Sequence, residues 1–218
     1  MSYTASAKSA VITNLDASPI VRATAGQGAP TRLSTQMATI TPGASDGTTV
    51  CYQMVRVPSN AIIRRVAVIL DSAATTFTGS IGVVWSTQPS DGSDQNASVG
   101  TTPTIISQSF FAYQMAMATF AYVPGTDPAN LVGLSAPVDI TFANSGGNSV
   151  TDGYYKPSFS NKPFWQAMAL SGAATTGGAF AWTKDPGGYF DITHFVTTTN
   201  SGAAVPYTML VDFTGEAS

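Results

Sequence analysis

The 218-residue chain contains a single glutamate, Glu216, and only four lysines. These two residue types usually cover the exposed faces of helices, so the chain is not expected to be largely helical. Charged residues make up 10% of the sequence, against about 25% in an average soluble domain. Hydrophobic residues make up 44%, and there are 20 glycines and 13 prolines. The composition predicts an all-β protein, with at most one or two short helices, whose surface consists of hydroxyl-bearing and small neutral side chains.

Strand-like runs separated by turn residues occur along most of the chain. The runs at 50–57 and 61–70 are rich in β-branched residues and are separated by Pro58-Ser59-Asn60, a turn signal. A third run, 77–85, contains Gly79 and Gly82, which indicate bulges. Further predicted strands, with loop-forming separators, are 138–142, 164–170, 179–183, 189–196 and 207–213. This pattern predicts an antiparallel β-sandwich, most simply a jelly roll.

Residues 105–120 are the stretch with helical character. Phe110, Tyr113 and Met117 recur at spacings of three and four, as on one face of a helix. Phe111, Tyr113, Met115 and Met117 also fall on alternate positions, as they would in a strand. We expect one short helix here, with a strand as the alternative.

Residues 1–49 differ from the rest of the chain. They are rich in serine, threonine and alanine, and their apolar residues follow no strict period. We interpret this segment as an extended N-terminal arm that becomes ordered along another surface, with one strand near 33–41. The alternative is a meander of strands of the same domain. The expected organisation is an arm at 1–49 and a jelly-roll β-sandwich domain at 50–218.

The sequence holds one histidine and one cysteine, so chemistry that needs either group must use His194 or Cys51. Alternation along 189–196 places His194 on the same face as Phe190 and Ile192, and no residue nearby in the sequence orients it as a general base. We expect a packed or rim histidine and a small buried cysteine. A lone cysteine also excludes an internal disulfide.

The sequence predicts no catalytic residues, no cofactor and no metal site. One cysteine and one histidine cannot build a four-ligand zinc centre, and Asp91–Asn96 lacks the spacing of an EF-hand loop. The Asp-Gly pairs at 46, 91 and 152, together with Asp185 before Pro186, are typical of turns. Paired aspartates of a glycan hydrolase are the alternative.

Three tryptophans raise the question of sugar binding by ring stacking. Trp85, Trp165 and Trp182 each lie in a predicted strand, where packing in the core is the usual role. A carbohydrate-binding surface is therefore kept only as an alternative.

The charge balance argues against nucleic acid and membrane partners. The net charge is −3, and the single basic pair, Arg64-Arg65, makes no patch. No apolar run approaches the roughly 20 residues needed to span a bilayer. The first residues also lack the apolar core of a signal peptide, and a lone cysteine fits synthesis in a reducing cytosol.

One passage resembles a known family. The segment Tyr52–Val66 reads Tyr-Gln-Met-Val-Arg-Val-Pro-Ser-Asn-Ala-Ile-Ile-Arg-Arg-Val and leads into an apolar strand that ends at Asp71. It resembles the head decoration, or cement, proteins of tailed bacteriophages, which have a jelly-roll fold. The Ile81-Gly82-Val83 step and the segment Ser18–Arg22 are similar in kind. The resemblance is firmest over residues 50–85.

The resemblance implies a non-enzymatic virion structural protein that binds the outside of a tailed-phage head and cements neighbouring major capsid subunits. It implies the major capsid protein as partner, a homo-oligomer (a dimer or a trimer), synthesis in the host cytoplasm and a final location on the capsid surface. The residues expected to contact the capsid or a partner are Pro19, Val21, Arg22, Leu33, Tyr154 and Tyr155. The alternatives are a head-fibre or tail component, and a carbohydrate-binding jelly-roll protein used in host attachment.

Overall fold

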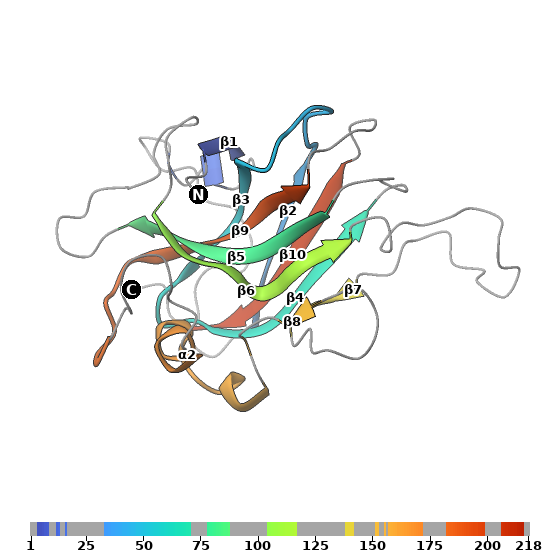
Figure 1. Ribbon diagram of the computed structural model, residues 1–218. Coiled ribbons are helices and arrows are strands. Elements are labelled where there is room, and N and C mark those ends of the chain that lie inside the picture. Colours follow the sequence, from blue (N-terminus) through green and yellow to red (C-terminus); the bar gives the residue numbers. More distant parts are fainter. Residues whose placement is uncertain are drawn as a thin grey trace, which may run out of the picture.

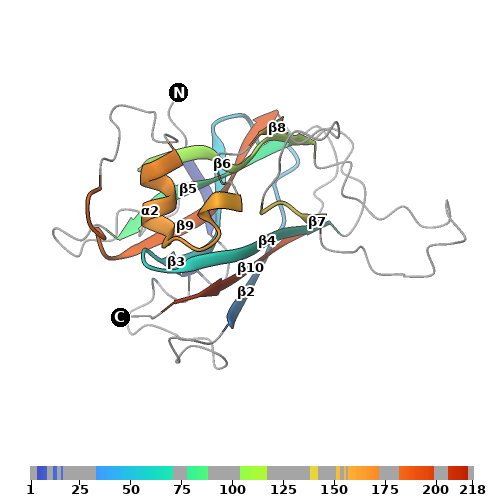
Figure 2. The same ribbon diagram turned by 90° about the horizontal axis from the view of Figure 1, so that it is seen from below.

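The computed structural model describes residues 4–8, 12–13, 16, 33–70, 78–87, 104–116, 138–141, 151–152, 155, 157–171, 182–198 and 206–215. Within them the chain forms two β-sheets packed face to face, with one α-helix and a 3-10 turn at one end (Figures 1 and 2). The predicted all-β sandwich is therefore confirmed. The elements, in chain order, are β1 (Thr4–Lys8), β2 (Leu33–Ile40), β3 (Val50–Pro58), β4 (Ile62–Leu70), β5 (Thr78–Thr87), β6 (Ile105–Ala116), β7 (Val138–Asp139), β8 (Thr151–Asp152), η2 (Pro157–Phe159), α2 (Phe164–Ser171), β9 (Tyr189–Thr198) and β10 (Tyr207–Thr214).

The larger sheet has the strand order β1-β3-β9-β5-β6-β8, and the smaller has the order β2-β10-β4-β7. All pairs in these sheets are antiparallel except β1 with β3, which are parallel. Consecutive strands from β2 to β5 alternate between the two sheets. Such alternation is typical of jelly rolls, in which hairpin-related strands are divided between two packed sheets.

Two segments of the predicted N-terminal arm are strands of the sandwich. β1 pairs with β3 in the larger sheet, and β2 pairs with β10 over eight residues in the smaller sheet. The strand predicted near 33–41 is therefore confirmed as β2. Residues 17–32, between them, lie outside the described residues.

The strands predicted with the clearest turn signals are confirmed. β3 and β4 flank the turn at Pro58-Ser59-Asn60, where the Ala61 amide donates to the Pro58 carbonyl at 3.1 Å. β5, β9 and β10 also form where expected. The strand predicted at 138–142 is shorter, because only Val138–Asp139 pairs with β4. In the predicted strand 179–183, only Trp182 and Thr183 are described, and neither is in a strand.

The helix predicted within 105–120 is wrong, and the alternative is confirmed: Ile105–Ala116 is β6. Pairing with β5 supplies the backbone hydrogen bonds that a helix would have made internally. The register of this pair shifts around Gly79 and Gly82 of β5, the two positions where the sequence predicts bulges. With these shifts, the adjacent Phe110 and Phe111 both contact Tyr155 and Phe164, whereas adjacent side chains of a regular strand point to opposite faces.

The strand predicted at 164–170 is also wrong, because Phe164–Ser171 is the helix α2. The buried residues Phe164, Ala167 and Met168 recur at spacings of three and four. The first amides of the helix find acceptors outside it: the Phe164 amide donates to the Ala61 carbonyl at 2.7 Å, and the Trp165 amide donates to the Ser59 carbonyl at 3.0 Å. The turn between β3 and β4 thus caps the helix.

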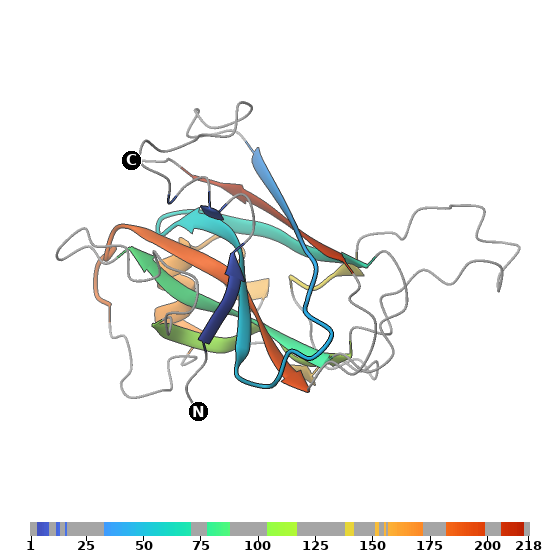
Figure 3. The ribbon, with the colours of Figure 1, turned by 90° about the horizontal axis from the view of Figure 1, so that it is seen from above.

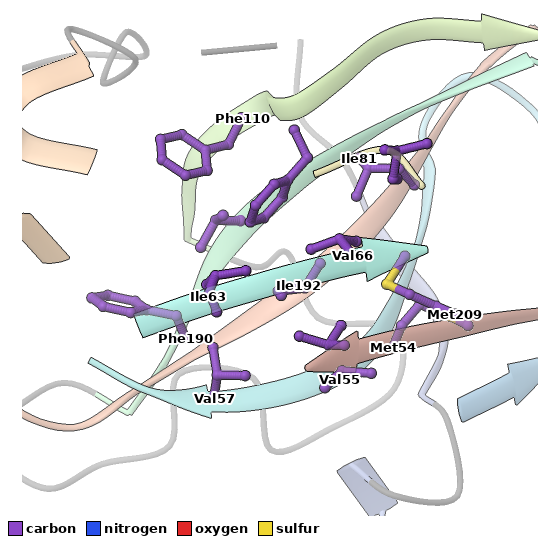
Figure 4. Close-up of a cluster of buried hydrophobic side chains, with 14 of the residues drawn as sticks. Met54, Val55, Val57, Ile63, Val66, Ile81, Phe110, Phe190, Ile192 and Met209 are labelled. Carbon is purple, nitrogen blue, oxygen red and sulfur yellow. The ribbon is translucent and has the colours of Figure 1, made fainter. Parts of the chain in front are cut away.

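The core fills the space between the two sheets. Figure 4 shows side chains from β3, β9, β5 and β6 of the larger sheet meeting those from β4 and β10 of the smaller sheet. Phe110, Phe111, Phe164, Phe190 and Tyr155 form a connected set of ring contacts with centroid separations of 5.1 to 5.9 Å. The buried residues labelled in Figure 4 are Met54, Val55, Val57, Ile63, Val66, Ile81, Phe110, Phe190, Ile192 and Met209.

The contact between β5 and β6 depends on the missing side chain of Gly82. A Cβ added there would lie 2.1 Å from the backbone oxygen of Ser107, which cannot move without breaking the strand pair. We therefore expect Gly82→Ala to lower the free energy of unfolding by about 2–3 kcal/mol through overpacking. Urea unfolding of the purified protein measures this.

Gly47→Ala is the matched control, because nothing lies within 4 Å of a Cβ added at that position. It should change stability by less than about 0.5 kcal/mol. Equal effects of the two substitutions would contradict the packing described for β5 and β6.

Candidate functional site

His194 is a packed side chain, as predicted. It is fully buried on the inward face of β9, and its Nδ1 lies 2.7 Å from the Tyr207 hydroxyl of β10 in the opposite sheet. Burial lowers the pKa of His194 to about 3, so the ring is neutral at ordinary pH. Gly79 makes room for it, since a Cβ there would lie 1.7 Å from Nε2. This environment suits a structural role rather than a general base, which must reach a substrate.

Cys51 is the small buried residue that the sequence predicts. It is fully buried and packs with Val84 and Phe195 on the outward side of the larger sheet. Burial raises the pKa of its thiol to about 12, which leaves it protonated and poorly nucleophilic.

A buried ion network is the polar cluster that the sequence did not predict. Arg56 of β3 binds Asp191 of β9 through two hydrogen bonds, from Nε at 2.8 Å and from a terminal nitrogen at 3.0 Å. Its other terminal nitrogen donates to Asp16, which also accepts from Lys8 at 2.6 Å. The Asp191 side chain is fully buried, and the other three are at most 8% exposed.

The network ties the N-terminal segment to the larger sheet. Burial raises the pKa of Asp191, while the charge and hydrogen bonds of Arg56 oppose this change. Burial alone would lower the pKa of Arg56, but the two carboxylates raise it, so the guanidinium stays charged. All the donors and acceptors named are used within the chain, which gives the network a structural character.

Aspartates have varied roles in the structure. Asp46 and Asp185 are turn residues as predicted: their carboxylates accept from the Gly43 and Gly187 amides at 2.6 and 2.9 Å. Asp152 is an exception, because it lies in β8 and pairs with β6. Asp91 lies outside the described residues. In the part of the chain that is described, no group of three or more His, Cys, Asp or Glu side chains could hold a metal ion.

The tryptophans pack against the core rather than forming an open platform. Trp85 in β5 is 6% exposed and stacks on Trp182 at a centroid distance of 5.4 Å. Trp182 lies outside a strand and Trp165 lies in α2, so both predicted strand positions are wrong. Both rings are partly buried against the hydrophobic core.

The predicted contact residues differ in their exposure to solvent. Leu33 is 59% exposed at the start of β2, which makes it available to a partner. Tyr155 is not an exposed loop tip: it is 3% exposed, because its ring packs on Phe110 and Phe111 and its hydroxyl donates to the Ile63 carbonyl at 3.0 Å. The remaining predicted contact residues lie outside the described residues; they are Pro19, Val21, Arg22 and Tyr154.

The most distinctive surface is the outward side of β2 and β10, which we call the β2 face. Met37 at its centre is 60% exposed and pairs with the half-buried Leu210. Hydroxyls flank this apolar row: Thr39 bonds Thr208 at 2.7 Å, and Thr35 donates to Asp212 at 2.6 Å. The β2 face comprises Leu33, Thr35, Met37, Thr39, Thr208, Leu210 and Asp212.

Comparisons with known proteins add little. No protein-family model matches the sequence, and no curated protein matches it. A chain of the solved structure described as "Cyanophage Pam1 capsid asymmetric unit" aligns with a TM-score of 0.33 and 15% identity, covering 88% of this chain and 91% of that chain. Similarity at this level does not establish a shared fold or function. Among the described helices, none has the length and hydropathy needed to cross a membrane.

Removal of one partner from the buried network should be costly. Arg56→Met leaves the Asp191 carboxylate buried without its ion pair, and we expect a loss of about 3–5 kcal/mol in the free energy of unfolding. The double variant Arg56→Met/Asp191→Asn should lose less, because it removes the uncompensated charge. Urea unfolding at neutral pH measures both.

Arg65→Met provides the control. Arg65 lies 3.9 Å from Asp139 in an exposed pair, so its loss should cost less than about 1 kcal/mol. A loss for Arg56→Met no larger than that of Arg65→Met would show that the buried network does not stabilise the fold.

Proposed function

We propose that this protein is a non-enzymatic structural protein of a tailed-phage virion, which binds the outside of the head and cements neighbouring major capsid subunits. The observation that carries the proposal is the β2 face, a patch of apolar and hydroxyl side chains with a single carboxylate, Asp212, on a packed sheet. A cement protein acts by burying surface at a junction between subunits, and a surface of this kind suits that task.

The composition of the β2 face supports adhesion. Its outward positions on β2 are leucine, threonine, methionine and threonine, with no charged residue along the strand. Lysine and glutamate are depleted in interface cores, partly because ordering their long side chains costs entropy, whereas methionine is enriched there. The strand is also held in place by eight residue pairs with β10, so little further ordering would be needed on binding.

The residues behind the family resemblance support the fold expected of a cement protein. The segment Tyr52–Val66 forms β3, the following turn and the start of β4, and Met54, Val55 and Val57 are fully buried. These residues therefore serve the core rather than a contact. We interpret the alternation of strands between sheets as a jelly roll with two added edge strands, β1 and β8.

The contacts are proposed to come from Leu33 on the β2 face and from Pro19, Val21, Arg22 and Tyr154, with the protein acting as a homo-oligomer. Many copies on one shell would turn individually weak contacts into strong avidity. No step of this function requires chemistry. That fits a histidine and a cysteine that both lie buried and a polar network that is satisfied within the chain.

Capsid binding tests the proposal. Wild-type protein mixed with undecorated capsids should co-sediment with them and raise the temperature at which they disassemble. Leu33→Asp should reduce the bound fraction at least about tenfold, because it places a charge where an apolar side chain is to be buried. A substitution is cleaner than deletion of the first 45 residues, which would remove β1, β2 and the buried Ile12.

Leu170→Asp is the matched control, since Leu170 is 55% exposed but lies on α2, away from β2. It should bind capsids as the wild type does. Failure of the wild-type protein to co-sediment with capsids would overturn the proposed function.

A further inference from the structure

The two described sheets have four edge strands, and three of them are blunted. β7 and β8 are two residues long and each contains an aspartate. β1 is five residues long and ends in Lys8, which is part of the buried ion network. Short length and charge are the usual means by which β-proteins prevent unwanted pairing at a sheet edge.

β2 is the exception among these edges. It is eight residues long and pairs with β10 without any shift of register. Its sequence, Leu-Ser-Thr-Gln-Met-Ala-Thr-Ile, contains no proline and no charged residue. Figures 2 and 3 show β2 at the outer margin of the smaller sheet, with β10 on one side. An edge of this kind is a ready template for another strand.

We propose that β2 pairs with β2 of a second copy of this chain. The two strands run antiparallel about a two-fold axis and join the two smaller sheets into one continuous sheet. The interface is isologous, because the same strand faces itself.

The alternation of side chains limits the register of such a pair. Residues directly opposite each other in an antiparallel pair point to the same face of the sheet. The two-fold axis must therefore pass next to one residue, which then lies opposite its own symmetry mate. An axis placed between two consecutive residues would set an outward side chain opposite an inward one. With the axis at Met37, the outward residues pair as Met37 with Met37 and Thr35 with Thr39. Threonine pairs are favourable across strands, so the outward pattern Thr-Met-Thr is self-complementary.

The neighbouring strand β10 extends this match. Leu210 lies beside Met37, so the central row of the joined sheet is apolar across both copies. Asp212 lies beside Thr35, and Thr208 lies beside Thr39. In the joined sheet, each Asp212 therefore lies in the same row as Thr208 of the second copy, and the two Asp212 side chains lie in different rows. No like charges meet along the rows that cross the axis.

This charge pattern favours a second copy as the occupant. A charged residue at the centre of β2 would face or lie diagonal to its own symmetry mate, and the strand carries no charge there or elsewhere. Eight residues span only about 27 Å, so an interface made by one strand edge is small and its association should depend on concentration. Crowding of copies on a surface would favour the pair.

Charge swapping at Met37 tests the proposal. Wild-type protein should form dimers with rising concentration in sedimentation equilibrium. Met37→Lys alone and Met37→Glu alone should each weaken the dimer at least about tenfold, since two like charges then face each other. An equimolar mixture of these two variants should recover dimers, because lysine then faces glutamate. A strand that binds any other partner has no reason to show this recovery.

Leu170→Lys is the control for a charge at an equally exposed apolar position, and it should dimerise as the wild type does. Circular dichroism of each Met37 variant checks that it is folded. A monomeric wild type at all concentrations, or a mixture that stays monomeric, would overturn the inference. Both outcomes are measured without capsids, so they are distinct from failure of the proposed function, which is scored by capsid binding alone.

Discussion

Contact between aromatic rings from distant parts of the chain is the interaction on which the described fold depends. Phe110 and Phe111 of β6 contact both Tyr155 and Phe164 of α2, and Phe164 in turn contacts Phe190 of β9. Each of these rings is 3% exposed or less. Because the Tyr155 hydroxyl also binds the Ile63 carbonyl of β4, the layer links both sheets and the helix. The packed sheet beneath the β2 face is thereby held in a fixed shape.

Four charged side chains are buried together in the protein interior, and charge is absent from the edge strand β2. Arg56, Asp191, Asp16 and Lys8 are drawn into one buried network that fastens the N-terminal segment. The long edge strand β2 carries no charge. In our account, the low charge content has a function: it leaves one sheet surface and one sheet edge suited to contact with other molecules. The proposed capsid binding uses the face of this strand, and the proposed pairing uses its edge.

The sequence predicted strands best where local signals agree. β3, β4, β9 and β10 combine alternating or apolar runs with clear turn residues, and all four form where expected. β6 was predicted wrongly because the spacing of Phe110 and Tyr113 fits a helix, while the pairing partner that decides the matter, β5, is remote in the chain. α2 was missed because its eight residues are short enough to resemble a strand, and its amides are capped by a turn more than 100 residues earlier.

The buried polar contacts could not be predicted either, because they also join residues that are distant in the sequence. Arg56 and Asp191 are separated by 135 positions, and neither lies in a motif, so no local pattern predicts their ion pair. An arginine between two valines and an aspartate between Phe190 and Ile192 are the only traces, since a lone charge in an apolar strand needs a partner. His194 was placed correctly on its face by alternation alone. Its contact with Tyr207 depends on how the two sheets pack, which the sequence does not reveal.

On the proposal that this protein comes from a tailed phage, the most direct test of the central claim is a cryo-electron microscopy reconstruction of the heads of that phage. Our account predicts that density matching the two-sheet sandwich lies on the outer surface, bridges neighbouring major capsid subunits and is lost when the gene is deleted. Heads whose outer surface lacks this density, in particles shown by mass spectrometry to contain the protein elsewhere, would contradict it.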